Sequence, residues 1–247
     1  QVAAVLNITP NHLDRHGSMQ AYIEAKSRIL RFQHQGDVAI LNRDDQGSWD
    51  LLDQARTDVI SFGMKAPGRR ENGTFIENNQ IMLQIGKDKL KMLPIDWINL
   101  RGEHNLYNVL AACAIAAGAT ISLPGIQLAV ETFDGVPHRL ELVRDLNGVR
   151  WYDDSIATAP ERTIAAINSF DEPIVLLLGG RDKNLPWDKL AQLIRRRVSR
   201  VVIFGEAGDL ILVFADALTR TWKQIIKFQP QGDVAKAAPR VELPSLE

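Results

Sequence analysis

Residues 7–30, NITPNHLDRHGSMQAYIEAKSRIL, hold the first side chains that could carry out chemistry. His12 and His16 lie in a polar turn directly after an apolar run that predicts a buried strand, and Lys26 lies on a helix-periodic stretch beyond it. α/β proteins present binding and catalytic groups in the loops that follow the carboxyl ends of their strands. A simpler interpretation also fits, in which Ser18 caps a helix and the polar side chains are solvated. Spacing alone favours this simpler interpretation.

A second group of polar residues opens a segment rich in Ala and Leu. Gly102, His104, Asn105 and Asn108 stand at the start of residues 103–117, whose composition predicts a helix. An Asn side-chain amide can donate and accept hydrogen bonds together, which suits it to ligand binding. On the residues alone, these amides more simply satisfy the free backbone groups of the helix start.

Three polar stretches follow in the second half of the chain. They read GVPHRLE, which contains Arg139, DDSIAT over 153–158 and LGGRDK over 178–183. The third stretch overlaps the end of PIVLLL, an apolar run that predicts a fully buried strand. Lys183 therefore stands just past a strand and two glycines. A solvated loop lysine is a weaker explanation there than it is for Lys26.

Taken together, these motifs resemble those of the Mur ligase family over nearly the whole chain. The patterns N-[IV]-T-x-[DN]-H-[LM]-D-R-H and Y-x-x-A-K are matched around His12 and Lys26. Further along, the chain resembles four more motifs of the family, which are, in order, G-x-H-N-x-x-N, [GP]-x-x-x-R-x-E, [ND]-D-S-K-A-T and L-G-G-x-x-K. The P-H-R at 137–139 is similar to the branch that adds glutamate to UDP-N-acetylmuramoyl-L-alanine in peptidoglycan synthesis. The folate-polyglutamate branch typically has P-G-R there.

The resemblance implies a magnesium site. In that family the histidine at the position of His12 binds Mg²⁺, and the lysine at the position of Lys26 is carbamylated and contributes to the metal site. We expect both to be catalytic residues. Carbamylation replaces a cation by an anion, and carboxylate-like oxygens are the ligands that Mg²⁺ prefers.

The resemblance also implies an ATP site. We expect Asn105, Asn108, Arg139 and Asp154 to bind ATP, with Asn108 at the adenine. An Asn amide suits the adenine edge because it donates and accepts. A guanidinium suits phosphate because its planar fork pairs bidentately with phosphate oxygens.

Glutamate is the amino acid that the resemblance implies. We expect Thr158, Lys183 and Ser155 to bind it. A hydroxyl and a cationic lysine facing a carboxylate make an ordinary pocket for an acidic substrate.

The function implied is that of an ATP-dependent ligase that adds D-glutamate to UDP-N-acetylmuramoyl-L-alanine through an acyl phosphate. Two alternatives stay open. One is another ligase of the same superfamily, such as an L-glutamate-adding muramyl ligase or a folylpolyglutamate synthase. The other is a non-catalytic fragment that binds nucleotide.

The chain departs from the family pattern in two ways. Ile156 stands where many of these ligases have lysine, which removes a cation near the substrate. The chain also has no G-x-x-G-K-[ST] loop to hold the ATP phosphates and no upstream UDP-binding domain. It ends before the S-P-A-like segment that would close the glutamate site. We therefore expect it to be part of a larger enzyme and unable to hydrolyse ATP alone.

Composition fits a globular cytoplasmic protein. The chain has 247 residues, 45% hydrophobic and 24% charged, with a net charge of −1. No global field favours nucleic acid or membranes, and no apolar run approaches the roughly 20 residues that span a bilayer. The single cysteine, Cys113, excludes an intrachain disulfide framework. We expect a monomer that binds neither nucleic acid nor membranes.

The alternation of apolar runs and helix-periodic stretches predicts an α/β fold in two domains. Residues 1–136 correspond to the second half of the central ATP-binding domain of the ligases. Residues 137–247 correspond to their Rossmann-like, doubly wound, glutamate-binding C-terminal domain, here truncated, with a mostly parallel sheet. We expect strands over 2–6, 37–42, 58–62, 141–145, 149–153, 173–178 and 200–204, and a small antiparallel unit over 73–93. We expect helices over 18–32, 48–56, 103–117, 122–134, 160–168, 186–195 and 207–218.

Overall fold

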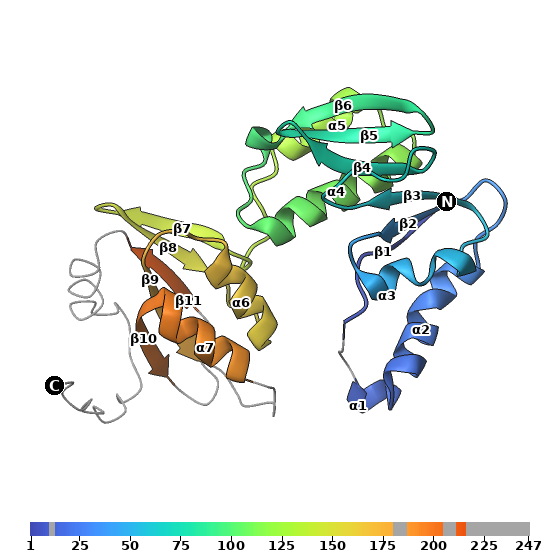
Figure 1. Cartoon of the computed structure of the whole chain (residues 1–247). Coiled ribbons are helices and arrows are strands. Elements are labelled where there is room, and N and C mark those ends of the chain that lie inside the picture. The colour runs from blue at the N-terminus through green and yellow to red at the C-terminus, as the bar shows by residue number, and fades with distance from the viewer. Residues whose placement is uncertain (10–12, 180–186, 205–210, 216–247) are drawn as a thin grey trace.

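The computed structural model describes residues 1–9, 13–179, 187–204 and 211–215, which form two α/β units (Figure 1). The first unit is built on a six-stranded sheet in the order β1-β2-β3-β4-β5-β6. The second is built on a five-stranded sheet in the order β10-β9-β11-β8-β7. The predicted α/β class is confirmed. Every helix within the described ranges falls short of the length and apolar character that a membrane span requires.

The first sheet is parallel at one end and antiparallel at the other. Its strands are β1 (Val2–Val5), β2 (Val38–Asn42), β3 (Asp58–Phe62), β4 (Asn72–Glu77), β5 (Gln80–Ile85) and β6 (Asp88–Pro94). Strands β1 to β4 pair in parallel, and β4, β5 and β6 pair antiparallel. Asn78 and Asn79 turn the β4–β5 hairpin with φ of 52° and 58°. Asn tolerates the left-handed conformation that a two-residue hairpin turn needs, so the predicted antiparallel unit is confirmed.

Helices cover both faces of this sheet. They are α1 (Leu13–His16), α2 (Met19–Arg31), α3 (Gln46–Trp49), α4 (Glu103–Gly118) and α5 (Leu123–Glu131), with 3₁₀ turns at Leu52–Gln54 and Ile95–Trp97. Side chains alternate between the faces along a strand. On β2, Ile40 therefore packs in the cluster with α4, and Leu41 packs in the cluster with α2.

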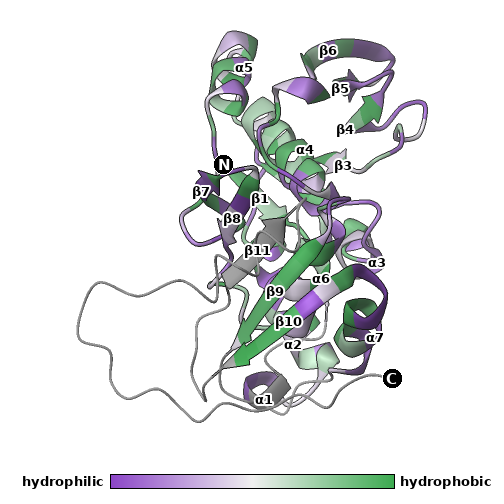
Figure 2. Cartoon of the chain, turned by 90° about the vertical axis from the view of Figure 1, so that its left-hand side faces the viewer, coloured by the Kyte–Doolittle hydropathy of each residue, from purple (hydrophilic) through white to green (hydrophobic). Residues whose placement is uncertain are grey.

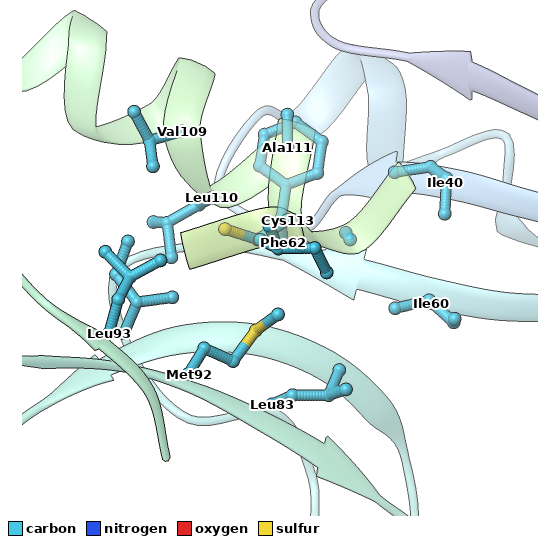
Figure 3. Close-up of a cluster of buried hydrophobic side chains, with 13 residues drawn as sticks. Ile40, Ile60, Phe62, Leu83, Met92, Leu93, Val109, Leu110, Ala111 and Cys113 are labelled. Atoms are coloured by element: carbon cyan, nitrogen blue, oxygen red, sulfur yellow. The ribbon is translucent and has the colours of Figure 1, made fainter. Parts of the chain in front are cut away.

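The core under α4 is the larger of these clusters. Leu110 and Cys113 from α4 are 0% exposed and meet Ile40 and Phe62 from the sheet (Figure 3). Burying a side chain of this size contributes about 1.5–3 kcal/mol. The small Ala residues of α4 let it lie close to the strands, which fixes the position of its first turn.

The second unit contains β7 (Glu141–Leu146), β8 (Val149–Asp153), α6 (Pro160–Asn168), β9 (Ile174–Gly179), α7 (Asp188–Arg197), β10 (Val198–Phe204) and β11 (Ile211–Ala215). Asn147 and Gly148, with φ of 55° and 78°, form the predicted turn between β7 and β8. Figure 2 shows β9 as almost continuously hydrophobic, as expected for a strand in the middle of a covered sheet.

Two predictions of local structure are wrong. Residues 211–215 form β11, antiparallel to both β8 and β9, where a helix over 207–218 was expected. A short apolar run such as ILVFA fits a helix or a strand equally. Here it forms a strand, because it pairs with β9 on one side and with β8 on the other. Among the described strands of this sheet only β9 and β10 pair in parallel, so this part of the sheet is mixed and not mostly parallel.

The predicted helix over 48–56 is also wrong in its extent. α3 begins earlier, because the Asp45 side chain accepts a hydrogen bond from the Ser48 N–H at 2.8 Å and caps the helix. Ser48 is fully buried and its Oγ donates to the Val5 carbonyl at 2.7 Å. This contact holds α3, which has a single turn, against β1.

Candidate functional site

A cavity of about 310 Å³ lies between the two units. Its polar lining comes from Asn7 after β1, His104 and Asn108 in the first turns of α4, Arg139 in the connection between the units, and Asp154 after β8. A second cavity of about 190 Å³ shares Asn7, His104 and Asn108 with the first. The structure thus brings together three of the four residues that the sequence predicted for ATP.

The second turn of α4 places Asn108 in the lining of both cavities. Asn108 Nδ2 donates to Asn105 Oδ1 at 3.1 Å, and Asn105 Nδ2 donates to the Arg101 carbonyl at 2.7 Å. Asn105 is buried and does not line either cavity. Its amide is therefore used to hold Asn108, which leaves the Asn108 carbonyl oxygen for a ligand.

Gly102 sets the direction of the start of α4. Its φ is 91°, and a Cβ at this position would lie 2.1 Å from Ser169 Oγ. Any other residue would be strained by the backbone conformation and would also clash with the second unit. The glycine of G-x-H-N is thus required by the close approach of α4 to the end of α6.

A tyrosine hydroxyl fixes α4 from the other side. The Tyr107 hydroxyl donates to Asp44 Oδ2 at 3.0 Å, and the same oxygen accepts from the Met64 N–H at 2.7 Å. Burial, followed by the hydrogen bond to Asp44, raises the pKa of Tyr107 to about 12. The hydroxyl thus stays protonated and remains a donor. This contact ties α4 to the loops after β2 and β3.

His104 lines the cavity but is not among the residues that the sequence predicted for ATP. It lines both cavities. Burial lowers the pKa of His104, and the positive charge of Arg139 lowers it further. A neutral imidazole offers one donor and one acceptor to a ligand. The signal was present in the sequence, since His104 belongs to the same G-x-H-N motif.

The connection between the units is tied to the loop after β8. His138 Nδ1 lies 2.7 Å from Asp153 Oδ2, and the Leu140 N–H donates to Asp154 Oδ1 at 3.1 Å. His138 and Leu140 have φ of 64° and 46°, a conformation that costs free energy outside glycine. These contacts hold Arg139 between two strained residues, with its exposed side chain lining the cavity.

Asp154 is the buried carboxyl of the cavity, at 4% exposure. Burial raises its pKa to about 6, against the lowering effects of the Leu140 N–H and of the Arg139 charge. A carboxyl in this state gains from any positive charge that enters the cavity. The neighbouring Asp153 differs: its hydrogen bonds to His138 and to the Ser155 N–H lower its pKa in spite of partial burial.

The residues predicted for glutamate are only partly placed. Thr158 is exposed and Ser155 is half-buried, and neither lines the 310 Å³ cavity. The Thr158 N–H donates to the Ile156 carbonyl at 2.9 Å, so this threonine belongs to the same loop as Asp154. Lys183 lies outside the described residues.

The residues predicted for magnesium are also partly placed. Lys26 Nζ donates to the Asn7 carbonyl at 2.8 Å and lies 5.0 Å from the centre of the Tyr22 ring. Asn7 lines both cavities, whereas Lys26 is in the lining of neither. His12 lies outside the described residues. Ser18 caps α2 as the simpler interpretation proposed, with Oγ accepting from the Ala21 N–H at 3.2 Å.

Comparison with known proteins assigns the chain to a family. The Mur ligase middle domain matches residues 1–116, and the Mur ligase glutamate ligase domain matches residues 138–240. The chain belongs to the Mur ligase family. This confirms the family expected from the motifs.

Among curated relatives, several are named UDP-N-acetylmuramoylalanine–D-glutamate ligase. The one from Roseiflexus sp. (strain RS-1) is 43% identical over 209 residues, which cover 82% of this chain and 45% of the relative. The one from Clostridioides difficile (strain 630) is 42% identical over 211 residues, 85% of this chain and 46% of the relative. The chain thus spans about half the length of the curated relatives it matches.

Solved structures share the fold. The chain is similar to MurF from Acinetobacter baumannii, with a TM-score of 0.63 and 23% identity over 83% of this chain and 46% of that one. It is also similar to MurF ligase from Thermotoga maritima in complex with ADP, with a TM-score of 0.58 and 16% identity over 94% of this chain and 56% of that one. At these identities the likeness concerns the architecture alone.

Proposed function

We propose that this chain supplies the nucleotide-binding and glutamate-binding parts of an ATP-dependent ligase that joins D-glutamate to UDP-N-acetylmuramoyl-L-alanine. The observation that carries the proposal is the cavity between the units, where Asn108, Arg139 and Asp154 meet from three separate segments. The names of the relatives at 42–43% identity supply the substrates. We propose that this reaction takes place in the cytoplasm, where ATP and UDP-linked substrates are available.

The two adjoining cavities suit the two ends of a nucleotide. The 190 Å³ cavity combines the apolar side chains of Leu6, Phe62 and Ala111 with the amide of Asn108. Asn7, Asn42, His104 and Tyr107 complete its lining. Apolar side chains beside an amide that donates and accepts are suited to a purine ring. The 310 Å³ cavity has the Arg139 guanidinium, which is suited to phosphate oxygens. The nucleotide would therefore run from α4 towards the second unit.

The reaction proposed has two steps. The γ-phosphoryl group of ATP passes to the carboxylate oxygen of the acceptor, giving ADP and an acyl phosphate. The amine of glutamate then attacks the carbonyl carbon, and the tetrahedral intermediate loses inorganic phosphate to form the amide. The contribution of this chain is positioning and charge: Arg139 offsets negative charge on the phosphates, and Asn108 fixes the base.

A magnesium site is proposed near the carboxyl end of β1. Lys26 Nζ donates to the Asn7 carbonyl just after this strand, and a carbamate on that nitrogen would supply oxygen ligands of the kind that Mg²⁺ prefers. We propose that His12 and a carbamylated Lys26 hold the ion. Mg²⁺ would supply charge neutralisation of the phosphoryl group.

Thr158, Ser155 and Lys183 are proposed to hold the glutamate. Thr158 and Ser155 follow Asp154 in one loop whose backbone is tied to the connection between the units through the Ile156 N–H and the His138 carbonyl, at 3.2 Å. If the two units close on each other, Thr158, Ser155 and Arg139 would therefore move together.

The test is phosphate release by the complete enzyme with ATP, Mg²⁺ and UDP-N-acetylmuramoyl-L-alanine. D-glutamate, L-glutamate, L-alanine and diaminopimelate are supplied in parallel. Release with D-glutamate alone is expected. Release with L-glutamate alone would identify the L-glutamate-adding alternative, and release with none would refute a muramyl ligase.

Lys26→Ala in the complete enzyme should abolish turnover, because no amine remains to be carbamylated. Bicarbonate should not restore it. Activity near that of the wild type would refute the carbamate role. Arg28→Ala, at an exposed residue two positions further along α2, is the matched control.

A further inference from the structure

Position 156 leaves the proposed substrate cavity one cation short of the family pattern. Ile156 stands in place of the lysine of [ND]-D-S-K-A-T, is 40% exposed and lines the 310 Å³ cavity. We propose that Arg162 of α6 supplies the missing positive charge and binds an anionic group of the substrate in this cavity, either a phosphate of the nucleotide or a carboxylate of the amino acid. The proposal deepens the function given above and rests on it.

The structure places the Arg162 guanidinium next to the backbone of Ile156. Its Nη1 donates to the backbone carbonyl of Ile156 at 3.2 Å. The guanidinium therefore lies beside the position that lacks a charge, although the two residues are six apart in the sequence. Both residues line the same cavity, together with Arg139 and Asp154. The other guanidinium N–H groups of Arg162 have no acceptor among the residues that the structure describes.

The charges around the cavity support an anion there. Two carboxylates, Asp154 and Glu161, and two guanidinium groups, Arg139 and Arg162, line it. Without Arg162, two acidic groups would face one cation, and a phosphate or carboxylate would be repelled. With Arg162, the two cations can pair with a ligand that carries negative charge.

The start of α6 adds to this preference. Arg162 lies in the first turn of a nine-residue helix whose N-terminal amides have no side-chain cap. Pro160 has no N–H, and the N–H groups of Arg162 and Thr163 donate to the Ala159 carbonyl, so the preference for an anion at this end comes from the helix dipole. α6 also faces the start of α4, where Asn108 lies (Figure 1).

Four variants separate charge from local structure. Arg162→Ala removes the whole side chain, and Arg162→Lys keeps the charge. Arg162→Gln keeps an N–H donor for the Ile156 carbonyl but removes the charge. Ile156→Lys, added to Arg162→Ala, restores a cation at the neighbouring position. Arg144→Ala on the exposed strand β7 is the matched control, and thermal melting shows that each variant is folded.

The measurement is calorimetric titration of the 247-residue chain with ATP, tripolyphosphate and D-glutamate, each separately. We expect Arg162→Ala and Arg162→Gln to weaken binding of at least one of these anions about fivefold or more, the effect of losing one charged hydrogen bond. Arg162→Lys and Arg144→Ala should stay within about twofold, and Ile156→Lys should restore the affinity of Arg162→Ala. A loss confined to ATP and tripolyphosphate identifies a phosphate, and a loss confined to D-glutamate identifies a carboxylate.

Two results would overturn the inference. In the first, Arg162→Gln binds all three anions with the affinity of the wild type. In the second, the wild type binds none of them. Failure of Ile156→Lys to restore binding would refute the claim that Arg162 takes the place of a lysine there. The ligase proposal fails separately. If the complete enzyme releases no phosphate with any amino acid while the Arg162 effect persists, the reaction is refuted and the anion site stands.

Discussion

The raised pKa of Asp154 makes a prediction about stability. Burial raises the pKa of its carboxyl to about 6 in the folded protein, against an ordinary value of 3.8. The folded state therefore favours the protonated form. This contribution is fully present below pH 3.8 and is lost as the pH rises through about 6. Above that pH, ionised Asp154 costs the fold up to about 3 kcal/mol, since each pKa unit corresponds to about 1.4 kcal/mol.

Asp154→Asn removes this cost and keeps the carbonyl oxygen that accepts from the Leu140 N–H. The variant should be more stable than the wild type at pH 8, by roughly 1–3 kcal/mol, and no more stable at pH 4. Urea unfolding at pH 4, 6 and 8, followed by tryptophan fluorescence, to which Trp151 in β8 contributes, measures the difference in the free energy of unfolding.

Asp171→Asn, at an exposed position of the same unit, is the control and should show no such dependence on pH. A difference between Asp154→Asn and the wild type that is equal at pH 4 and pH 8 would refute the reasoning. Asp154→Asn should also bind ATP with Mg²⁺ more weakly than the wild type, because it has no buried carboxylate to pair with a cation.

Three further predictions concern how the site is held. Gly102→Ala should cost more than about 1 kcal/mol of unfolding free energy in urea titrations, because its φ is 91° and the new Cβ would lie 2.1 Å from Ser169 Oγ; a neutral result would contradict the required close approach. Leu110→Ala should cost about 2–5 kcal/mol, as expected for a side chain that is 0% exposed, and calorimetric melting would show a lower Tm for the first unit. Glu172→Gln should cost only about 1 kcal/mol of unfolding free energy, because the ion pair between Glu172 and Arg101 at 3.1 Å is partly exposed. This loss of stability should decrease at high salt. A loss that does not depend on salt would exclude an electrostatic origin.

Local patterns in the sequence determined most of the first unit. Ser18 predicted the start of α2, Asn78-Asn79 predicted the β4–β5 hairpin, and the Ala-rich segment 103–117 predicted α4. Each of these features depends on neighbouring residues: a capping hydroxyl, a turn that needs positive φ, or a run of good helix formers. Such interactions act over a few residues, so a sequence reveals them directly.

The run over 211–215 shows what the local pattern leaves open. Its residues suit a helix or a strand, and pairing with β8 and β9 makes it β11. Those partners come from elsewhere in the chain, so periodicity alone cannot decide between the two structures.

The motifs also named most of the site residues, but only the tertiary structure assigned their contacts. Asn105 and Asn108 belong to one motif, yet only Asn108 lines the cavity, because Asn105 is buried behind it. The sequence showed that position 156 has isoleucine where the family pattern has a charged lysine, and the fold places Arg162 beside it. The pKa of Asp154 likewise depends on burial by distant segments. Residue types and local propensities are written in the sequence, whereas burial, distance and electrostatic environment arise only when remote segments pack together.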